Sequence, residues 1–284
     1  MNVGLVLSGG MAKGAYEVGA LKAVSEFFAP EDIRYISAAS VGALNSFAYA
    51  CGELDLAYEL WRGINRNNEK LFISTAVKSE SFKRSIYILS GKKPFCDKLY
   101  VPLFNLKSRS NYYFDLVEKG RDELEGYLRA SVAFIPICRP VCLNGKYYYD
   151  GAVIDNIPVY PLYKHSLDFI ICIYFDEYNY LFESEYFDNK VVKISLYNKN
   201  EVLNKSIWFT RESTEQMFAD GYKKARSVLE FVFSKGVSDA DAVCSRIASL
   251  NDLNPQKKPR LTGDIAIRNL NKIIKKVTGR KMTE

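Results

Sequence analysis

Histidine is almost absent from this chain of 284 residues, which has a single one, His165. A serine hydrolase ordinarily uses a histidine to accept the proton of its nucleophile. His165 falls in a polar, lysine-containing stretch, on a short helix expected ahead of an apolar strand, so we interpret it as a surface or helix-end residue. If a serine of this chain is a nucleophile, we therefore expect its base to be a carboxylate.

Paired metal-binding cysteines are also absent. None of the six cysteines forms a CxxC pair, and with one histidine the chain offers no ordinary Cys/His zinc site. We expect reduced, mostly buried thiols and neither metal nor cofactor. No apolar run approaches the roughly 20 residues that span a bilayer, and the first residues lack the features of a signal peptide. The expected location is the cytoplasm, with or without peripheral membrane contact.

Charge is unevenly distributed along the chain. Residues 255–284 hold nine basic residues and two acids and so carry a charge of +7. Residues 1–254 carry about −1, which gives the net charge of +6. We therefore expect one domain over 1–254 and a basic extension over 255–284. Residues 263–279 fit an amphipathic helix that either contacts anionic lipid or packs on the domain. No aromatic side chain accompanies these charges, so nucleic-acid binding is not expected.

The first 51 residues alternate strand and helix. Apolar runs predict strands over 2–7 and 34–39, and helical spacing predicts helices over 14–28 and 41–51. This order is typical of an α/β domain with a mainly parallel sheet. Further strands are expected over 146–150, 169–174 and 191–196, with helices over 123–132 and 214–233. Residues 65–111 show weak periodicity and are interpreted either as a cap over a pocket or as a plain insertion.

A glycine loop, Gly9-Gly10-Met11-Ala12-Lys13-Gly14, joins the first predicted strand to the first helix. It is not a P-loop, because Lys13 precedes the last glycine and no Ser or Thr follows it. It is not a dinucleotide loop, because Met11 occupies the position of the second glycine. An oxyanion hole made of backbone amides fits the loop, as does a simple tight connection.

Two short motifs carry candidate reacting groups. Ala38-Ala39-Ser40-Val41-Gly42 is a G-x-S-x-G elbow with alanine in the first position, and Ser40 is either a nucleophile or an N-cap of the next helix. Asp150-Gly151-Ala152 reads, by pattern alone, as a turn at the end of a strand. A buried aspartate could act as the base, since burial raises its pKa.

Three segments together resemble one family. LSGGMAKGAYEVGAL, SAASVGALNS and YYYDGAVIDNIPV are similar, in order and spacing, to the motifs of the patatin-like phospholipases, in particular the bacterial type. The resemblance covers about residues 3 to 235. It implies a three-layer α/β/α fold with a mainly parallel central sheet and a Ser–Asp catalytic dyad.

The resemblance also assigns roles to individual residues. Ser40 becomes the nucleophile and Asp150 its base, and the amides of Gly9, Gly10 and Met11 form the oxyanion hole. Lys13 stands near the loop, where it faces a lipid phosphate or caps carbonyl groups. The other motif positions are Gly14, Ala38, Gly42, Gly151 and Ala152. Two departures stand out: Met11 and Ala38 replace glycines, and Met11 would be strained if its φ were positive.

The implied activity is that of a phospholipase A or lysophospholipase, which cleaves fatty acyl esters of glycerolipids through an acyl-enzyme. Two alternatives stay open. One is a hydrolase or transferase that acts on another ester or a thioester. The other is a non-catalytic lipid-binding or regulatory protein on the same scaffold, for which Met11 and Ala38 are the best support.

Overall fold

The structure is a computed structural model that describes residues 1–64, 71–198, 208–237, 239–253 and 256–260. The helix predicted over 263–279 lies outside these residues. Within them, no helix is both long and apolar enough to cross a membrane.

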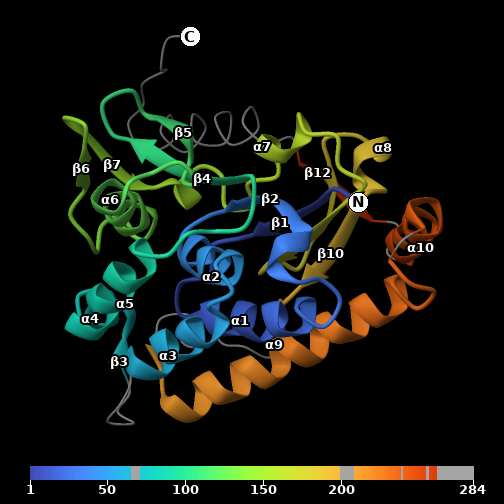
Figure 1. Ribbon diagram of the computed structural model, residues 1–284, viewed down its shortest axis with the longest axis horizontal. Coiled ribbons are helices and arrows are strands. Elements are labelled where there is room, and N and C mark those ends of the chain that lie inside the picture. The colour runs from blue at the N-terminus through green and yellow to red at the C-terminus, as the bar shows by residue number, and fades with distance from the viewer. Residues whose placement is uncertain (65–70, 199–207, 238, 254–255, 261–284) are drawn as a thin grey trace.

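An eight-stranded sheet runs through the middle of the molecule, with the order β10-β8-β1-β2-β4-β7-β6 and with β5 on the second edge of β4 (Figure 1). The strands from β10 to β4 are parallel, whereas β5, β6 and β7 are antiparallel to their neighbours. The strands are β1 (Val3–Leu7), β2 (Ile33–Ala38), β4 (Lys98–Asn105), β5 (Ser110–Asp115), β6 (Val141–Leu143), β7 (Lys146–Asp150), β8 (Phe169–Tyr174) and β10 (Val191–Ser195). Two small sheets pair β3 (Leu71–Phe72) with β11 (Trp208–Phe209), and β9 (Asn179–Phe182) with β12 (Lys257–Arg260).

Helices cover both faces of this sheet. The longer ones are α1 (Gly14–Val24), α2 (Val41–Ala50), α3 (Leu54–Ile64), α5 (Glu80–Ser90), α6 (Arg121–Ser131), α9 (Arg211–Val232) and α10 (Ala240–Asp252). Single turns form α4 (Ile73–Ala76), α7 (Tyr160–Tyr163) and α8 (Glu185–Asp188), and 3-10 turns form η1 (Met11–Lys13), η2 (Pro30–Asp32) and η3 (Gly151–Val153). The long α9 packs against α1 on one face (Figure 1).

The alternation of side chains along β1 divides the core in two. Leu5 and Leu7 belong to the larger cluster with α1, α2 and α9, whereas Val6 belongs to a smaller cluster with α7, α8 and β9. Strands buried on both faces read as continuous apolar runs, as β1 and β8 do. The predicted three-layer α/β/α fold with a mainly parallel sheet is confirmed.

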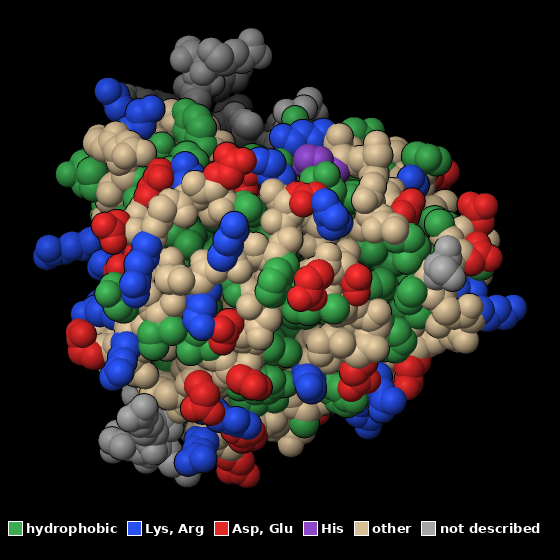
Figure 2. Space-filling view, viewed as in Figure 1, with side chains coloured by type: hydrophobic (Ala, Val, Ile, Leu, Met, Phe, Trp, Pro, Cys, Tyr) green, Lys and Arg blue, Asp and Glu red, His purple; other side chains and the backbone are tan. Residues whose placement is uncertain are grey.

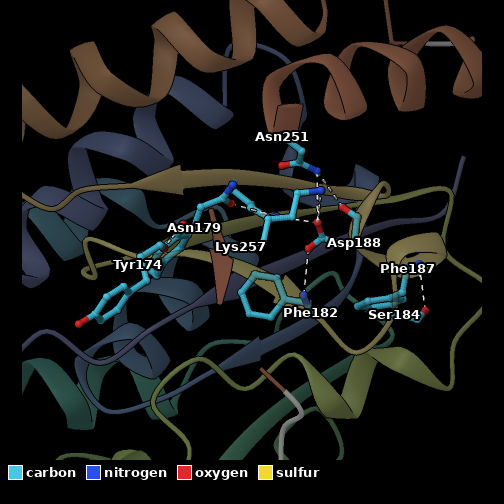
Figure 3. A network of polar contacts seen from close by, with 10 residues as sticks. Tyr174, Asn179, Phe182, Ser184, Phe187, Asp188, Asn251 and Lys257 are labelled. Carbon is cyan, nitrogen blue, oxygen red and sulfur yellow. Dashed lines mark hydrogen bonds and ion pairs between the residues drawn. The ribbon is translucent and has the colours of Figure 1, made fainter. Parts of the chain in front are cut away.

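A buried ion pair fastens the end of the described chain to this fold (Figure 3). The carboxylate of Asp188 in α8 is fully buried, and its Oδ2 lies 2.7 Å from Lys193 Nζ and 3.8 Å from Lys257 Nζ. Asn251 Nδ2 donates to the same oxygen at 3.4 Å. Strand β12, which begins the predicted extension, is therefore packed on the domain through both its backbone and Lys257.

The weakly periodic stretch 65–111 contains a sheet strand, β4, as well as α5. Residues 98–105 are therefore part of the central sheet and are neither a cap nor an insertion, whereas Val77, earlier in the segment, lines a pocket together with Ser40. Pro102, in the middle of β4, obscures the strand in the sequence because proline cannot donate to a ladder. It is tolerated because β2 pairs with β4 only as far as Tyr100, and β7 pairs only from Leu103 onward.

The cysteine expectation holds in part. All six cysteines are free thiols, but only Cys96 and Cys172 are buried, and Cys142 is exposed.

Candidate active site

Strand β4 brings the ends of β2 and β7 together. The first residues of β4 pair in parallel with β2, and this pairing ends where Ser37 lies opposite Tyr100. The last residues of β4 pair in antiparallel with β7, and this pairing begins where Asp150 lies opposite Leu103. Because β5 occupies the other edge of β4, both strands lie on one edge with their carboxyl ends facing each other. Ser40, two residues beyond β2, and Asp150, the last residue of β7, meet at this point.

Ser40 occupies a strained turn between β2 and α2. Its φ of 56° and ψ of −132° lie outside the regions that non-glycine residues favour. The residue stands at the N-cap position of α2, yet its hydroxyl caps no helix N–H, and it is 7% exposed. This geometry matches a nucleophile elbow better than a helix cap.

Small residues on either side of Ser40 permit the turn. A Cβ at Gly42 would lie 2.6 Å from the carbonyl oxygen of Ser8, so glycine is required for α2 to pack this closely on the end of β1. Ala38 is fully buried at the end of β2, where the fold accommodates its methyl group. The replacement of the first motif glycine therefore leaves the elbow intact.

Asp150 is buried beside Ser40, with 2% of its surface exposed. Burial raises its pKa to about 7, and contacts with the Ser40 hydroxyl and the Ala152 N–H oppose this rise. Oδ1 accepts the Ala152 N–H at 2.9 Å, whereas Oδ2 has no well-formed hydrogen bond within the described residues. One carboxylate oxygen is thus left for the proton of Ser40, on a group whose pKa suits a base at neutral pH.

Asn156 clamps the glycine loop. The Gly9 N–H donates to Asn156 Oδ1 at 3.0 Å and to its backbone oxygen at 3.2 Å, and Asn156 Nδ2 donates to the Gly9 carbonyl at 3.1 Å. A Cβ at Gly9 would lie 2.7 Å from Ser40 Cβ, so only glycine lets the loop approach the nucleophile this closely. The predicted role of Gly9 as an oxyanion donor is therefore wrong, because its N–H is already bonded.

Three other amides are available to an oxyanion. The N–H groups of Gly10, Met11 and Val41 make no hydrogen bond to another described residue. Met11 has a positive φ of 52°, so its backbone is strained, as expected for a non-glycine residue in this conformation. Val41 was missed by the sequence analysis, although the residue after the nucleophile is a recognised oxyanion donor in such elbows.

A second buried carboxylate stands behind this loop. Asp155, 1% exposed, accepts the Tyr113 hydroxyl at 2.6 Å and lies 3.4 Å from Arg260 Nη2 of β12. Burial raises its pKa, and Arg260 and Tyr113 oppose the rise. Asp155 and Asn156 both lie within the third sequence motif, but their partners are distant in the chain and carry no local signal.

An apolar slot opens beside Ser40. Its volume is about 20 Å³, which is room for roughly one water molecule. It is lined by Met11, Ser40, Val41, Val77, Val132, Phe134, Ile137 and Cys138. An acyl chain can enter only by displacing some of these side chains. Lys13 is not among the lining residues; it ends η1 and is partly exposed.

His165 lies elsewhere and has its own partners. Its ring stacks on Tyr35 at a centroid distance of 4.1 Å, and Nε2 lies 3.2 Å from the Tyr100 hydroxyl. Burial, followed by the charges of Lys164 and Lys98, lowers its pKa. The interpretation of His165 as a helix-end residue fits this position, just beyond α7.

Two curated proteins are similar to about 60% of this chain. The chain is 26% identical over 181 residues to the "Lysophospholipase NTE1" of Candida albicans, covering 60% of this chain and 13% of that protein. It is 26% identical over 185 residues to the "Neuropathy target esterase sws" of Drosophila melanogaster, with 61% and 13% covered. The chain thus spans only about an eighth of the length of these curated relatives.

Similar solved structures include VipD from Legionella pneumophila, with a TM-score of 0.49 and 12% identity over 100% of this chain and 81% of that one. Another is ExoU, with a TM-score of 0.44 and 16% identity over 81% of this chain and 53% of that one.

The family itself is identified by sequence. Residues 5–163, more than half of the chain, match the model of the family described as patatin-like phospholipase. The chain belongs to the patatin-like phospholipase family.

Proposed function

We propose that this protein is a serine acyl hydrolase of the phospholipase A or lysophospholipase type, which cleaves fatty acyl esters of glycerolipids. The observation that carries the proposal is the pairing of a strained, uncapped Ser40 with a buried Asp150 whose pKa is about 7. Family membership and the names of the lysophospholipase relatives support the choice of substrate.

The proposed reaction begins with proton transfer. Asp150 accepts the proton of Ser40 as Oγ attacks the ester carbonyl, and the amides of Gly10, Met11 and Val41 stabilise the oxyanion. Collapse of the tetrahedral intermediate breaks the ester bond, and the leaving alcohol takes the proton from Asp150. Water, deprotonated by Asp150, then attacks the acyl-enzyme and releases a fatty acid with free Ser40.

Hydrolysis of a nitrophenyl acyl ester and fatty acid release from a lysophospholipid test the proposal. We expect Ser40→Ala to abolish turnover, Asp150→Asn to lower kcat by a factor of at least about 10³, and His165→Ala to change kcat less than about threefold. Wild-type turnover by Ser40→Ala would refute the nucleophile. An active Asp150→Asn beside an inactive His165→Ala would refute the dyad.

A fluorophosphonate probe separates an enzyme from a binding protein on the same scaffold. We expect covalent labelling of the wild type at Ser40 and no labelling of Ser40→Ala. Labelling at the same low level in both proteins would favour the non-catalytic alternative.

We also propose peripheral contact with anionic membrane through residues 263–279. The test is truncation after Arg260, which retains β12 and its contacts with Asp155 and Asp188. Binding to vesicles of phosphatidylglycerol should fall at least about tenfold, and the melting temperature should not change. Undiminished vesicle binding by the truncated protein would exclude this role.

A further inference from the structure

A second cavity adjoins the slot beside Ser40. It has a volume of about 410 Å³ and lies where α5, α6 and the segment 132–142 come together, among the helices at the left of Figure 1. Val77, Val132 and Cys138 line both this cavity and the slot, so the two adjoin. We call the larger part the α5–α6 cleft.

The α5–α6 cleft has an apolar floor and a basic rim. Phe82, Ile86 and Val132 form buried parts of the floor. The rim carries four exposed cations and no acid among the lining residues: Lys78, Lys83, Arg129 and Arg139. The face in Figure 2 as a whole carries charges of both signs, interspersed. The lining of this cleft thus carries cations alone, on a domain whose basic and acidic residues nearly balance.

Two of these cations have no acidic partner among the residues that the structure describes. Lys83 lies 2.6 Å from Glu80, and Arg129 lies 3.5 Å from Glu125, both as exposed pairs on one helix. Lys78 and Arg139 form no ion pair with any acid in the described part of the chain. Their charges are available to an anion in the cleft.

The basic rim is close to the reacting groups. The Cys138 thiol lines both the slot and the cleft. Burial is the main cause of its raised pKa; a backbone contact with Phe134 and the charge of Lys78 lower the pKa, and the charge of Asp150 raises it. Lys78 and Asp150 thus both lie within electrostatic reach of one sulfur atom. In a glycerophospholipid the phosphate is only a glycerol unit away from the ester.

We propose that the α5–α6 cleft binds the acidic phosphate headgroup of the lipid whose ester reaches Ser40, with Lys78 and Arg139 as its ligands. This inference rests on the proposed function and narrows the substrate to lipids with a net negative headgroup. Lys78 and Arg139 would donate charge-assisted hydrogen bonds to the phosphate oxygens.

The kinetic test uses short-chain monoacyl lipids below their micelle-forming concentration, so that membrane attraction does not contribute. We expect the wild type to hydrolyse a phosphoglycerol lipid with a kcat/KM at least about tenfold higher than a monoacylglycerol. Lys78→Gln/Arg139→Gln should raise KM for the phosphoglycerol lipid at least about tenfold and leave nitrophenyl ester hydrolysis within about twofold. The control Arg84→Gln/Lys235→Gln removes the same charge outside the cleft and should behave as the wild type.

Three kinetic results would overturn the proposal. The first is a wild type indifferent to headgroup charge. The second is a double variant that loses activity equally on charged and neutral esters. The third is a control variant that is as impaired as the cleft variant, which would mean that overall charge matters rather than the cleft.

A binding measurement separates this proposal from the proposed function. Ser40→Ala cannot turn over the lipid. Calorimetry with the phosphoglycerol lipid therefore measures its binding to the cleft, even if the wild type proves inactive. We expect binding that is lost in Ser40→Ala/Lys78→Gln/Arg139→Gln, and at least about tenfold weaker binding of glycerol 3-phosphate. Equal affinity for glycerol 3-phosphate would assign the cleft to free phosphate compounds and overturn the lipid proposal, as would equal binding by the triple variant.

Discussion

Asn156 and Gly9 exchange three hydrogen bonds although 147 positions separate them in the chain. Asn156 follows Asp150 by six residues, so one short segment carries the candidate base and also holds the oxyanion loop. A shift of this segment therefore changes both halves of the site at once.

Replacement of Asn156 by alanine should affect turnover more than stability. Asn156→Ala removes both side-chain hydrogen bonds to Gly9, and we expect the loop amides to lose their alignment with the oxyanion. The expected loss in kcat is about 10²-fold, near that of removing one oxyanion donor, with a smaller change in KM. Steady-state kinetics on a nitrophenyl ester measure both quantities.

Asn156→Asp provides the comparison, since it can accept the Gly9 N–H but cannot donate to the Gly9 carbonyl. Its kcat should fall between those of the wild type and Asn156→Ala. A wild-type kcat for Asn156→Ala, in a protein with an unchanged melting temperature, would show that the clamp has no part in catalysis.

Activity and stability should change in opposite directions with pH. Burial raises the pKa of Asp150 from an ordinary 3.8 to about 7. Only the ionised form can accept a proton, so kcat/KM should rise through pH 7 and level off above it. Between about pH 4 and pH 7 the folded protein binds more protons than the unfolded chain, so this residue lowers stability as pH rises through that window.

Asp150→Asn tests the stability half of this argument. The variant cannot ionise at this position, so at pH 8 it should exceed the wild type in free energy of unfolding by an amount on the order of a few kcal/mol. At pH 4 the two proteins should be alike. Urea unfolding at the two pH values measures this difference in free energy of unfolding. If the difference between variant and wild type were smaller at pH 8 than at pH 4, the pKa of Asp150 would not be raised by burial.

The strain at Met11 can be isolated with two substitutions. Both Met11→Gly and Met11→Ala remove the side chain that packs against the core, but only alanine keeps the penalty of a positive φ. Met11→Gly should therefore be more stable than Met11→Ala by about 1 kcal/mol in urea unfolding. Equal stability of the two variants would mean that the loop relaxes to another backbone conformation in solution.

Loss of Arg260 should destabilise the protein through Asp155. Arg260→Gln leaves a buried carboxylate with the Tyr113 hydroxyl as its remaining side-chain partner. We expect a loss of about 1–3 kcal/mol, below that of a fully buried pair because Arg260 is partly exposed. The loss should grow as the pH rises, because burial raises the pKa of Asp155 and only its ionised form needs the charge of Arg260.

The double variant Arg260→Gln/Asp155→Asn removes both charges and is the control. It should recover at least half of the stability lost by Arg260→Gln when both are unfolded in urea. No recovery would show that Arg260 acts through its stacking on Tyr180 and not through Asp155.

Much of the sheet could be predicted from the sequence. The strands β7 and β8 occur at the predicted residues, because apolar or aromatic runs bounded by turn residues are a local signal. Strand β4 could not be predicted, since Pro102 is acceptable only where β2 has ended and β7 has not begun. That condition depends on the pairing of three distant segments.

The candidate site was predictable to a similar degree. Ser40 and Asp150 stand in recognisable motifs, whereas the raised pKa of Asp150 depends on burial that no local pattern records. The Gly9 amide was expected to bind an oxyanion, but its N–H donates to Asn156, which lies in another motif. The narrow slot depends on Val77, in the weakly periodic stretch 65–111, and on Phe134, which lies between two predicted elements.

The end-to-end arrangement of β2 and β7 along β4 also has a kinetic consequence. Residues 33–40, 98–105 and 146–150 must all associate before Ser40 can meet Asp150. Such nonlocal pairings are slow to form, because each requires closure of a long loop. Recovery of esterase activity after dilution from denaturant is therefore expected to report the last stage of folding, after helix content has returned.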